Sequence, residues 1–251
     1  MAEVLYKYLD AEGGLKMLKN SNLQFTNATK FNDPFDCHPA LFDYAHVPTT
    51  PNNWPPADFI QSKGELDMEN LRNSTWICCL SKVFDSLLMW AYYTKHKGIC
   101  IGLNKDAVVM SCQRKFISTI LPFPTEVQYK DIHQKPNYFG NQYSWLDLLT
   151  TKAKDWEHEQ EIRIIAKDPM WINGVQDIPT EFKKDESVDW KEVRHYPCLS
   201  RECFESVYLG TKISDKDKDR IIKAAKKLNP NIKIYQMKTD PEAFKLKEEI
   251  I

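Results

Sequence analysis

The sequence predicts an α+β fold in a single domain that covers residues 1–251. Short apolar runs typical of strands are interspersed with longer stretches that have helical spacing. No internal repeat and no linker rich in Pro or Gly divides the chain. With 42% hydrophobic residues, 251 residues can bury one sizeable core, so one α+β domain with flanking helices accounts for the whole sequence.

The N-terminal region combines two strand signals with one helix signal. Residues 4–8 are apolar and aromatic enough for an edge or early strand, and residues 23–26 alternate apolar and polar side chains. Between them, Asp10 is placed to cap a helix. Four prolines within residues 44–58 exclude a helix or a central strand there, so we expect a loop.

The middle of the chain carries the clearest signals. Residues 75–80 read as a buried strand that ends at Ser81, and residues 86–93 have the length and composition of a buried helix. A second apolar strand follows at 99–103. We therefore expect a strand, a helix and a strand joined by very short connections.

The second half of the chain begins with a helix, expected over 144–156, and continues with a strand over 161–166. The charged stretch 181–194 is expected at the surface. Ser214 followed by Asp217 resembles a capping box at the start of a later helix. The remaining expected elements are a strand at 207–210, that helix from about Lys216 to Asn229, and a strand at 232–235.

Charge and cysteine content narrow the class of protein. The 34 Lys and Arg residues against 35 Asp and Glu give a formal net charge of −1, so binding to a polyanion would need a local patch. No apolar run approaches the roughly 20 residues that cross a bilayer, and the first residues are not leader-like, so we expect a cytoplasmic protein without a membrane partner. The sequence has seven cysteines and no CxxC pair. We therefore expect reduced thiols and predict no metal site from them.

The most unusual local sequence is the acidic run before the strand at 161–166. If the chain is extended from Glu159 onward, Glu159, Glu161 and Arg163 share one face, while Ile162 and Ile164 point to the core. Neighbouring carboxylates raise each other's pKa and a guanidinium lowers it, and such a trio could hydrogen-bond sugar hydroxyls. The alternative is a solvated strand face with a salt bridge.

A second candidate group lies where the strand at 75–80 ends. Ser81 could point its hydroxyl into a crevice at the sheet edge, and Tyr92 or Tyr93 could stack on a flat heterocycle. The helical spacing of Met89, Trp90 and Tyr93 is equally typical of simple packing.

A third candidate group lies in the turn at 31–37. Asp33 and Asp36 bracket Pro34, which is typical of side chains that hydrogen-bond their own backbone. Together with His38 they could instead hold a metal ion.

Blocks along most of the chain resemble the bacterial domain-of-unknown-function family 2971, which carries no established activity. These blocks are 5–8, 31–37, Ser81 with 88–93, 96–102, Trp156 with 159–163, and 209–210.

A second resemblance implies an activity. An early strand with a polar residue, a middle strand that ends in Ser before an aromatic helix, and a late Glu-x-Glu are similar to the three-part site of the ADP-ribosyltransferase superfamily. The resemblance implies a split, mostly antiparallel sheet core that binds NAD in the cleft between its two halves.

Carried over by position, the resemblance implies the following roles. The NAD-binding residues are Lys7 or Tyr8 at the adenosine ribose, Ser81, and Tyr92 or Tyr93 at the nicotinamide, with Asn32, Asp33 and Arg163 completing the set. Glu161 is the implied catalytic carboxylate, because a carboxylate that holds the ribose 2′-hydroxyl stabilises an oxocarbenium-like state. Glu159 would face the acceptor and orient or deprotonate it.

The sequence therefore predicts an NAD-dependent ADP-ribosyltransferase that modifies a macromolecular acceptor, either protein or nucleic acid. Use as a toxin or phage-defence effector would suit this activity, and a toxin could have a neutralising protein partner. Two alternatives stay open. One is a non-catalytic ligand-sensing or partner-binding module, and the other is a metal-dependent hydrolase or nuclease built on Asp33, Asp36, Glu159 and Glu161.

Overall fold

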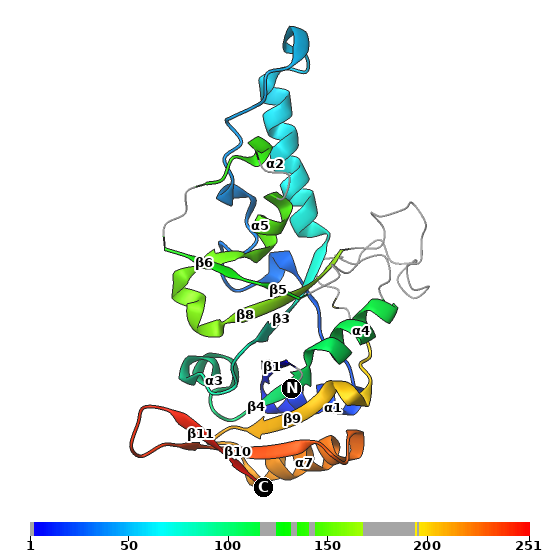
Figure 1. Cartoon of the computed structure of the whole chain (residues 1–251), viewed down its shortest axis with the longest axis vertical. Helices are drawn as coiled ribbons and strands as arrows, with labels where there is room; N and C mark the ends of the chain where they lie inside the picture. Colours follow the sequence, from blue (N-terminus) through cyan, green and yellow to red (C-terminus); the bar gives the residue numbers. More distant parts are fainter. Residues whose placement is uncertain (1–2, 116–123, 132–134, 141–143, 168–193, 195) are drawn as a thin grey trace.

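The computed structural model describes residues 3–115, 124–131, 135–140, 144–167, 194 and 196–251. These residues form a nine-stranded sheet with helices packed against it (Figure 1). Along the sheet the strand order is β11-β10-β9-β4-β1-β3-β8-β5, with β2 paired to β3. Among these pairs β9 and β10 are parallel and the others antiparallel, so the predicted α+β class with a mostly antiparallel sheet is confirmed.

The elements have the following bounds. The sheet strands are β1 (Val4–Leu9), β2 (Thr26–Asn27), β3 (Thr75–Ser81), β4 (Ile99–Asn104), β5 (Thr125–Glu126), β8 (Glu161–Lys167), β9 (Phe204–Leu209), β10 (Lys233–Thr239) and β11 (Leu246–Ile250). A separate pair joins β6 (Gln128–Lys130) and β7 (Thr151–Ala153). The α-helices are α1 (Ala11–Asn20), α2 (Ala57–Asn73), α3 (Leu87–Thr94), α4 (Lys105–Lys115), α5 (Ser144–Thr150) and α7 (Asp215–Leu228). Short 3-10 helices are η1 (Ala28–Lys30), η2 (Pro39–Leu41), η3 (Pro51–Asn53), η4 (Tyr138–Gly140), η5 (Lys154–Glu159) and η7 (Arg201–Cys203).

Three helices begin after capping residues, two of which, Asp10 and Ser214, are predicted from the sequence. The side chains of Asp10, Ser86 and Ser214 each accept a hydrogen bond from the backbone N–H three residues further on. Each cap satisfies an amide that has no partner within its helix. The predicted starts of α1, α3 and α7 are therefore confirmed.

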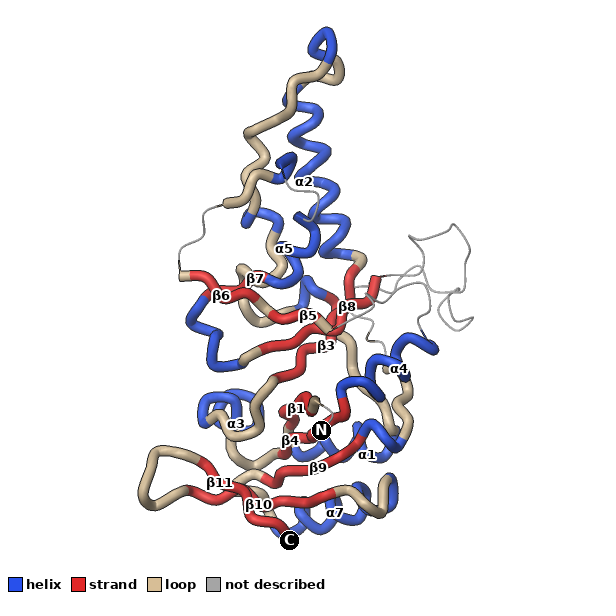
Figure 2. The backbone as a smooth tube through the Cα atoms, viewed as in Figure 1, coloured by secondary structure: helices blue, strands red, loops and turns tan. Residues whose placement is uncertain are grey.

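The sheet opens between β1 and β3. β1 pairs with β4 along all six of its residues but with β3 at the single position where Tyr6 lies opposite Ser81. β3 pairs instead with β8 along its whole length. Figure 2 shows the result: β3, β8 and β5 lie with α2 and α5, and β1, β4 and β9 lie with α1 and α7.

The largest apolar cluster fills the side of the sheet that α1, α4 and α7 cover. Side chains of one parity along each strand enter it, among them Ile162 and Ile164 of β8 and Ile99 and Ile101 of β4. The predicted core side of β8 is therefore confirmed. A smaller cluster around Trp90 packs α3 against the other face of β1, β4 and β9.

Two expectations need correction, and two elements were not predicted. The helix expected over 144–156 ends at Thr150, and the chain then forms β7 and η5, because the two β-branched threonines at 150 and 151 favour an extended backbone. Of the extended stretch at 23–26, Thr26 enters a strand, β2. The sequence did not predict α2, which begins at the end of the proline-rich loop, and it did not predict β11. Most of the charged stretch 181–194 lies outside the described residues, and Arg194 is exposed.

Gly98 joins α3 to β4 where the backbone of β1 passes closest. A Cβ at this position would lie 2.1 Å from the Leu9 carbonyl oxygen, which is backbone and cannot rotate away. We expect Gly98→Ala to lower the free energy of unfolding by about 1–3 kcal/mol, measured by urea denaturation. An unchanged midpoint would mean that β1 and β4 separate there at no cost.

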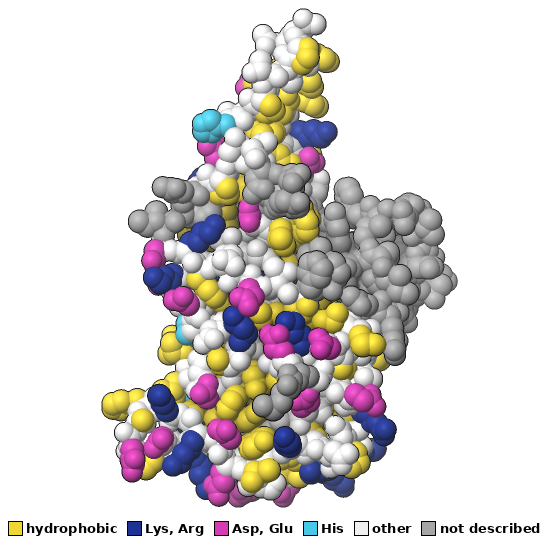
Figure 3. Space-filling model, viewed as in Figure 1, with side chains coloured by type: hydrophobic (Ala, Val, Ile, Leu, Met, Phe, Trp, Pro, Cys, Tyr) yellow, Lys and Arg dark blue, Asp and Glu magenta, His cyan; other side chains and the backbone are white. Residues whose placement is uncertain are grey.

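The surface offers no large field of one sign on the face shown in Figure 3, where Lys and Arg alternate with Asp and Glu. This agrees with the net charge of −1. Among the described helices, none combines the length and apolarity that a membrane span requires.

Candidate functional site

A cavity of about 430 Å³ lies where β1 and β3 diverge. This volume is in the range of small-molecule sites. Seven of the ten residues predicted for the site line it, namely Lys7, Tyr8, Asn32, Ser81, Tyr93, Glu159 and Glu161. The opening of the sheet therefore brings together residues from the first, middle and late parts of the chain.

The other three predicted residues lie elsewhere. Tyr92 is 65% exposed, its ring lies 5.9 Å from that of His158, and of the two tyrosines predicted to stack on a ligand it is Tyr93 that lines the cavity. Asp33 is buried and accepts a hydrogen bond from the Phe35 backbone N–H (2.9 Å), as expected of a turn residue. Arg163 is completely buried beside Glu161 and does not line the cavity.

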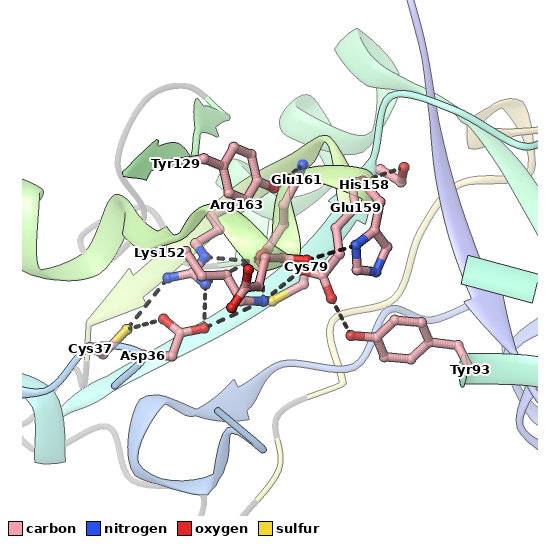
Figure 4. A network of polar contacts seen from close by, with 12 residues as sticks. Asp36, Cys37, Cys79, Tyr93, Tyr129, Lys152, His158, Glu159, Glu161 and Arg163 are labelled. Carbon is pink, nitrogen blue, oxygen red and sulfur yellow. Dashed lines mark hydrogen bonds and ion pairs between the residues drawn. The ribbon is translucent and has the colours of Figure 1, made fainter. Parts of the chain in front are cut away.

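Glu161 is the first residue of β8 and lies directly opposite Ser81 in the sheet. Its side chain is 4% exposed and is held by Arg163, whose Nε donates to Oε1 at 2.9 Å and whose Nη2 donates to Oε2 at 3.3 Å. The Cys79 thiol on β3 also hydrogen-bonds this carboxylate. Burial raises the pKa of that thiol well above its usual value, so it stays a neutral donor. The carboxylate is thus fixed in place at the wall of the cavity (Figure 4).

Glu159 reaches the same place by a different backbone route from the one expected. It is the last residue of η5, and Gln160 then takes a left-handed conformation (φ 42°), so the predicted extended chain from Glu159 onward is wrong. The short helical turn nevertheless leaves Glu159 buried at the cavity wall, 3% exposed. Its carboxylate accepts hydrogen bonds from the Tyr93 hydroxyl and from Lys152 Nζ, the latter at 2.5 Å from Oε2.

Lys152 on β7 connects the acidic residues. The sequence did not predict it as a site residue. Its Nζ lies 2.5 Å from Glu159 Oε2, 3.3 Å from Glu161 Oε2 and 3.7 Å from Asp36 Oδ2. The ammonium group also lies 4.7 Å from the centre of the Trp156 ring, a favourable cation–π contact. In the sequence Lys152 belongs to a polar stretch with no signal of its own, because its position depends on the pairing of β6 with β7.

Asp36 comes from the 31–37 turn and is the second counter-ion of Arg163. Arg163 Nη2 donates to Asp36 Oδ2 at 2.6 Å, and Nη1 donates to the Leu149 carbonyl at 2.7 Å. Asp36 is 2% exposed, so this charge is removed from water and is compensated by the guanidinium. The turn therefore supplies a buried charge partner in addition to its local hydrogen bonds.

Five buried charged groups thus form one network (Figure 4): three carboxylates, of Asp36, Glu159 and Glu161, and two cations, of Lys152 and Arg163. With all five ionised the network carries a charge of −1, since −3 + 2 = −1. Arg163 and Lys152 both contact the Glu161 carboxylate, whereas Lys152 and the Tyr93 hydroxyl contact that of Glu159.

The pKa values of Glu159 and Glu161 are shifted in opposite directions. Burial acts to raise the pKa of Glu161, but the charges of Arg163 and Lys152 outweigh it and lower that pKa to about 2. Burial also raises the pKa of Glu159, the negative charge of Glu161 adds to the rise, and Lys152 only partly offsets it, so its pKa stays above the usual value. Glu161 is therefore ionised at neutral pH, and Glu159 is the group better placed to exchange a proton there.

Three other lining residues, Lys7, Tyr8 and Ser81, connect the segments around the cavity by hydrogen bonds. Lys7 Nζ on β1 donates to the Cys79 carbonyl of β3 at 2.7 Å, and the Tyr8 hydroxyl donates to the Val83 carbonyl at 3.0 Å. The Ser81 hydroxyl donates to the Glu159 carbonyl at 2.7 Å and so joins the end of β3 to the end of η5. These hydrogen bonds link β1, β3 and η5 around the cavity.

One alternative predicted from the sequence is a metal site built on Asp33, Asp36, Glu159 and Glu161. In the part of the chain that the structure describes, no group of three or more His, Cys, Asp or Glu side chains is placed to hold a metal ion. The position among the carboxylates of Asp36, Glu159 and Glu161 is taken by the Lys152 ammonium group. His38, a suggested ligand, accepts a hydrogen bond from the Ala40 backbone N–H at 3.1 Å.

Part of the chain matches a known protein family. Residues 89–164 match the model of a family described as protein of unknown function (DUF2971). The matched segment extends from α3 into β8, so it includes Tyr93, Lys152, Glu159 and Glu161 and leaves out the blocks at 5–8, 31–37 and 209–210. No curated protein and no solved structure matches the chain. The resemblance to the ADP-ribosyltransferase superfamily therefore stays a prediction.

Proposed function

We propose that this protein is an NAD-dependent ADP-ribosyltransferase that modifies a macromolecular acceptor. The observation that carries the proposal is the pair of buried glutamates, Glu159 and Glu161, whose pKa values are shifted apart at the wall of one cavity. Two neighbouring carboxylates with separated pKa values can divide the work of electrostatic stabilisation and proton transfer.

Glu161 would stabilise the positive charge that develops on the ribose. In the transfer, the bond between ribose C1′ and the nicotinamide nitrogen breaks, and nicotinamide leaves as a neutral molecule with the bonding electron pair. The ribose then carries an oxocarbenium-like positive charge. A carboxylate that is ionised at every physiological pH, and is already fixed by Arg163 and Cys79, needs no reorganisation to oppose this charge.

Glu159 would act as the base for the acceptor. A lone pair of the acceptor forms the new bond to C1′, and the proton that the acceptor loses passes to the Glu159 carboxylate. The raised pKa of Glu159 makes it the better proton acceptor of the two glutamates. The Tyr93 hydroxyl, which donates to the Glu159 carboxylate, positions that base and presents an aromatic ring to the cavity.

Release of nicotinamide from labelled NAD tests the proposal, with and without cell lysate as the source of acceptor. We expect Glu161→Gln to reduce the release rate by about 100-fold, because one aimed carboxylate is lost from the transition state. Glu157→Gln is the matched control, since Glu157 is an exposed glutamate in η5 that does not line the cavity. A thermal melt of each variant separates loss of chemistry from loss of fold.

Other results would support the alternatives. Tight binding of NAD or ADP-ribose without nicotinamide release from any acceptor would contradict the transferase and favour a ligand-sensing module. Metal-dependent cleavage of nucleic acid that is lost in Asp33→Asn would favour the hydrolase or nuclease. Equal release rates for Glu161→Gln and Glu157→Gln would show that Glu161 has no part in the reaction.

A further inference from the structure

A second cavity lies beside the first. It has a volume of about 600 Å³ and extends along β1 and the start of α1. Lys7 and Gln24 line both cavities, so the two spaces are neighbours that share one wall. A ligand longer than the first cavity could therefore continue past Lys7 into the second.

The side chains that line this second cavity carry a net positive charge. Three cations, Lys7, Lys16 and Arg194, line it together with two carboxylates, those of Asp10 and Glu12, and the Lys7 ammonium also donates to the Cys79 carbonyl. The Asp10 carboxylate caps α1 and accepts from the Gly13 backbone N–H at 2.6 Å. The Glu12 carboxylate is taken up by Arg220, whose Nη1 donates to Oε1 at 2.5 Å and whose Nη2 donates to Oε2 at 3.3 Å.

Neutral hydrogen-bonding groups complete the wall. Asn20 and Asn22 line the cavity, and the Tyr196 hydroxyl, which donates to Gln24 Oε1 at 3.4 Å, lies at its edge. Amides and hydroxyls next to cations are the groups that bind phosphate oxygens. Three carboxylates, those of Asp36, Glu159 and Glu161, line the first cavity together with three lysines, Lys7, Lys30 and Lys152, so its lining charges balance.

We infer that the second cavity is an anion site that holds the phosphate groups of a ligand bound at Glu161. This inference rests on the proposed function, and it explains how that ligand would be oriented. The end that becomes cationic lies at the carboxylates of the first cavity, and the phosphates lie among Lys7, Lys16 and Arg194. The phosphates belong either to the dinucleotide itself or to a phosphorylated acceptor.

Calorimetric binding of ADP-ribose and of inorganic pyrophosphate tests the inference without turnover. We expect Lys16→Glu to weaken pyrophosphate binding by about tenfold, since one charge-assisted contact is lost and a repulsive charge is introduced. Lys19→Glu is the matched control, because Lys19 is an exposed lysine on the same helix that does not line the cavity. Arg194→Glu is a second variant, in a different segment of the chain, with the same expected direction.

The two probes distinguish the sources of the phosphate. If Lys16→Glu weakens both ADP-ribose and pyrophosphate, the dinucleotide supplies the phosphates. If it weakens pyrophosphate alone, the acceptor supplies them. If Lys16→Glu and Lys19→Glu have equal effects, the inference is wrong. Nicotinamide release, measured separately, decides the proposed function, so a protein that binds pyrophosphate through Lys16 and releases no nicotinamide would keep the anion site and lose the transferase.

Discussion

Replacing Arg163 by methionine is expected to lower the free energy of unfolding by about 3–5 kcal/mol. The guanidinium is completely buried and is hydrogen-bonded to the carboxylates of Asp36 and Glu161 and to the Leu149 carbonyl. Methionine keeps much of the side-chain volume but leaves Asp36 and Glu161 in a low-dielectric interior with Lys152 as their remaining cation. Urea denaturation at neutral pH measures the loss.

The control for this prediction is an exposed arginine. Arg201 pairs with Glu202 at 3.0 Å, and the two side chains are 70% and 64% exposed. Solvent screens such a pair, so Arg201→Met should cost less than about 1 kcal/mol. Equal losses for Arg163→Met and Arg201→Met would contradict the claim that buried carboxylates depend on Arg163. Adding Asp36→Asn to Arg163→Met should recover part of the loss, because the added change removes one of the uncompensated charges.

Local sequence signals predicted the elements that depend on local physics. The predicted caps at Asp10 and Ser214 lie at the true starts of two helices, because a cap needs only its own next turn. The apolar runs at 75–80 and 99–103 form β3 and β4, which are buried on both faces and so need continuous apolar sequence.

Elements that depend on distant partners were not predictable in the same way. α2 has mainly polar residues, and its buried positions, such as Gly64 and Met68, pack against Tyr44, Tyr138 and other side chains from remote segments. β11 is exposed apart from Leu246, so it has little apolar pattern and is held by its hydrogen bonds to β10. In such elements tertiary contacts decide the conformation.

The candidate site also combines residues that a local sequence pattern predicts with residues whose place depends on distant parts of the chain. Glu-x-Glu is visible as a local pattern, and the sequence placed Glu161 and Arg163 on one face correctly. The partners of these residues are invisible in that pattern: Asp36 lies 127 residues before Arg163, and Lys152 reaches the glutamates only because β7 pairs with β6. Charge compensation is a property of the folded chain, and spacing along the sequence does not encode it.

The two glutamates should give opposite pH dependences when each is replaced by glutamine. Glu161 has a lowered pKa, so its charge stabilises the fold above its unfolded pKa of about 4.3, and that stability is lost as the pH falls toward about 2. At neutral pH the difference in pKa corresponds to about 3 kcal/mol, and about half of this should be gone near pH 3. Glu161→Gln should therefore be most destabilising at neutral pH and progressively less so in acid.

Glu159 should behave in the reverse sense. Its pKa is raised in the folded protein, so the folded state favours the protonated carboxyl, and the stability that this contributes is lost as the pH rises through the folded pKa. Glutamine imitates the neutral form, so Glu159→Gln should gain stability relative to the natural protein as the pH rises from about 4 toward neutrality. Urea denaturation of the natural protein and both variants, from about pH 3 to about pH 8, gives the two difference curves.

The slopes of these two curves decide whether Glu161 and Glu159 can take separate roles, one as a fixed negative charge and the other as a base. Opposite slopes mean that one carboxylate is held ionised and the other can take up a proton, as the transferase requires of Glu161 and Glu159. Parallel slopes would mean that Lys152 and Arg163 compensate both groups equally. In that case the network would be a buried ion cluster that stabilises the opening of the sheet, and Glu159 could not serve as the base.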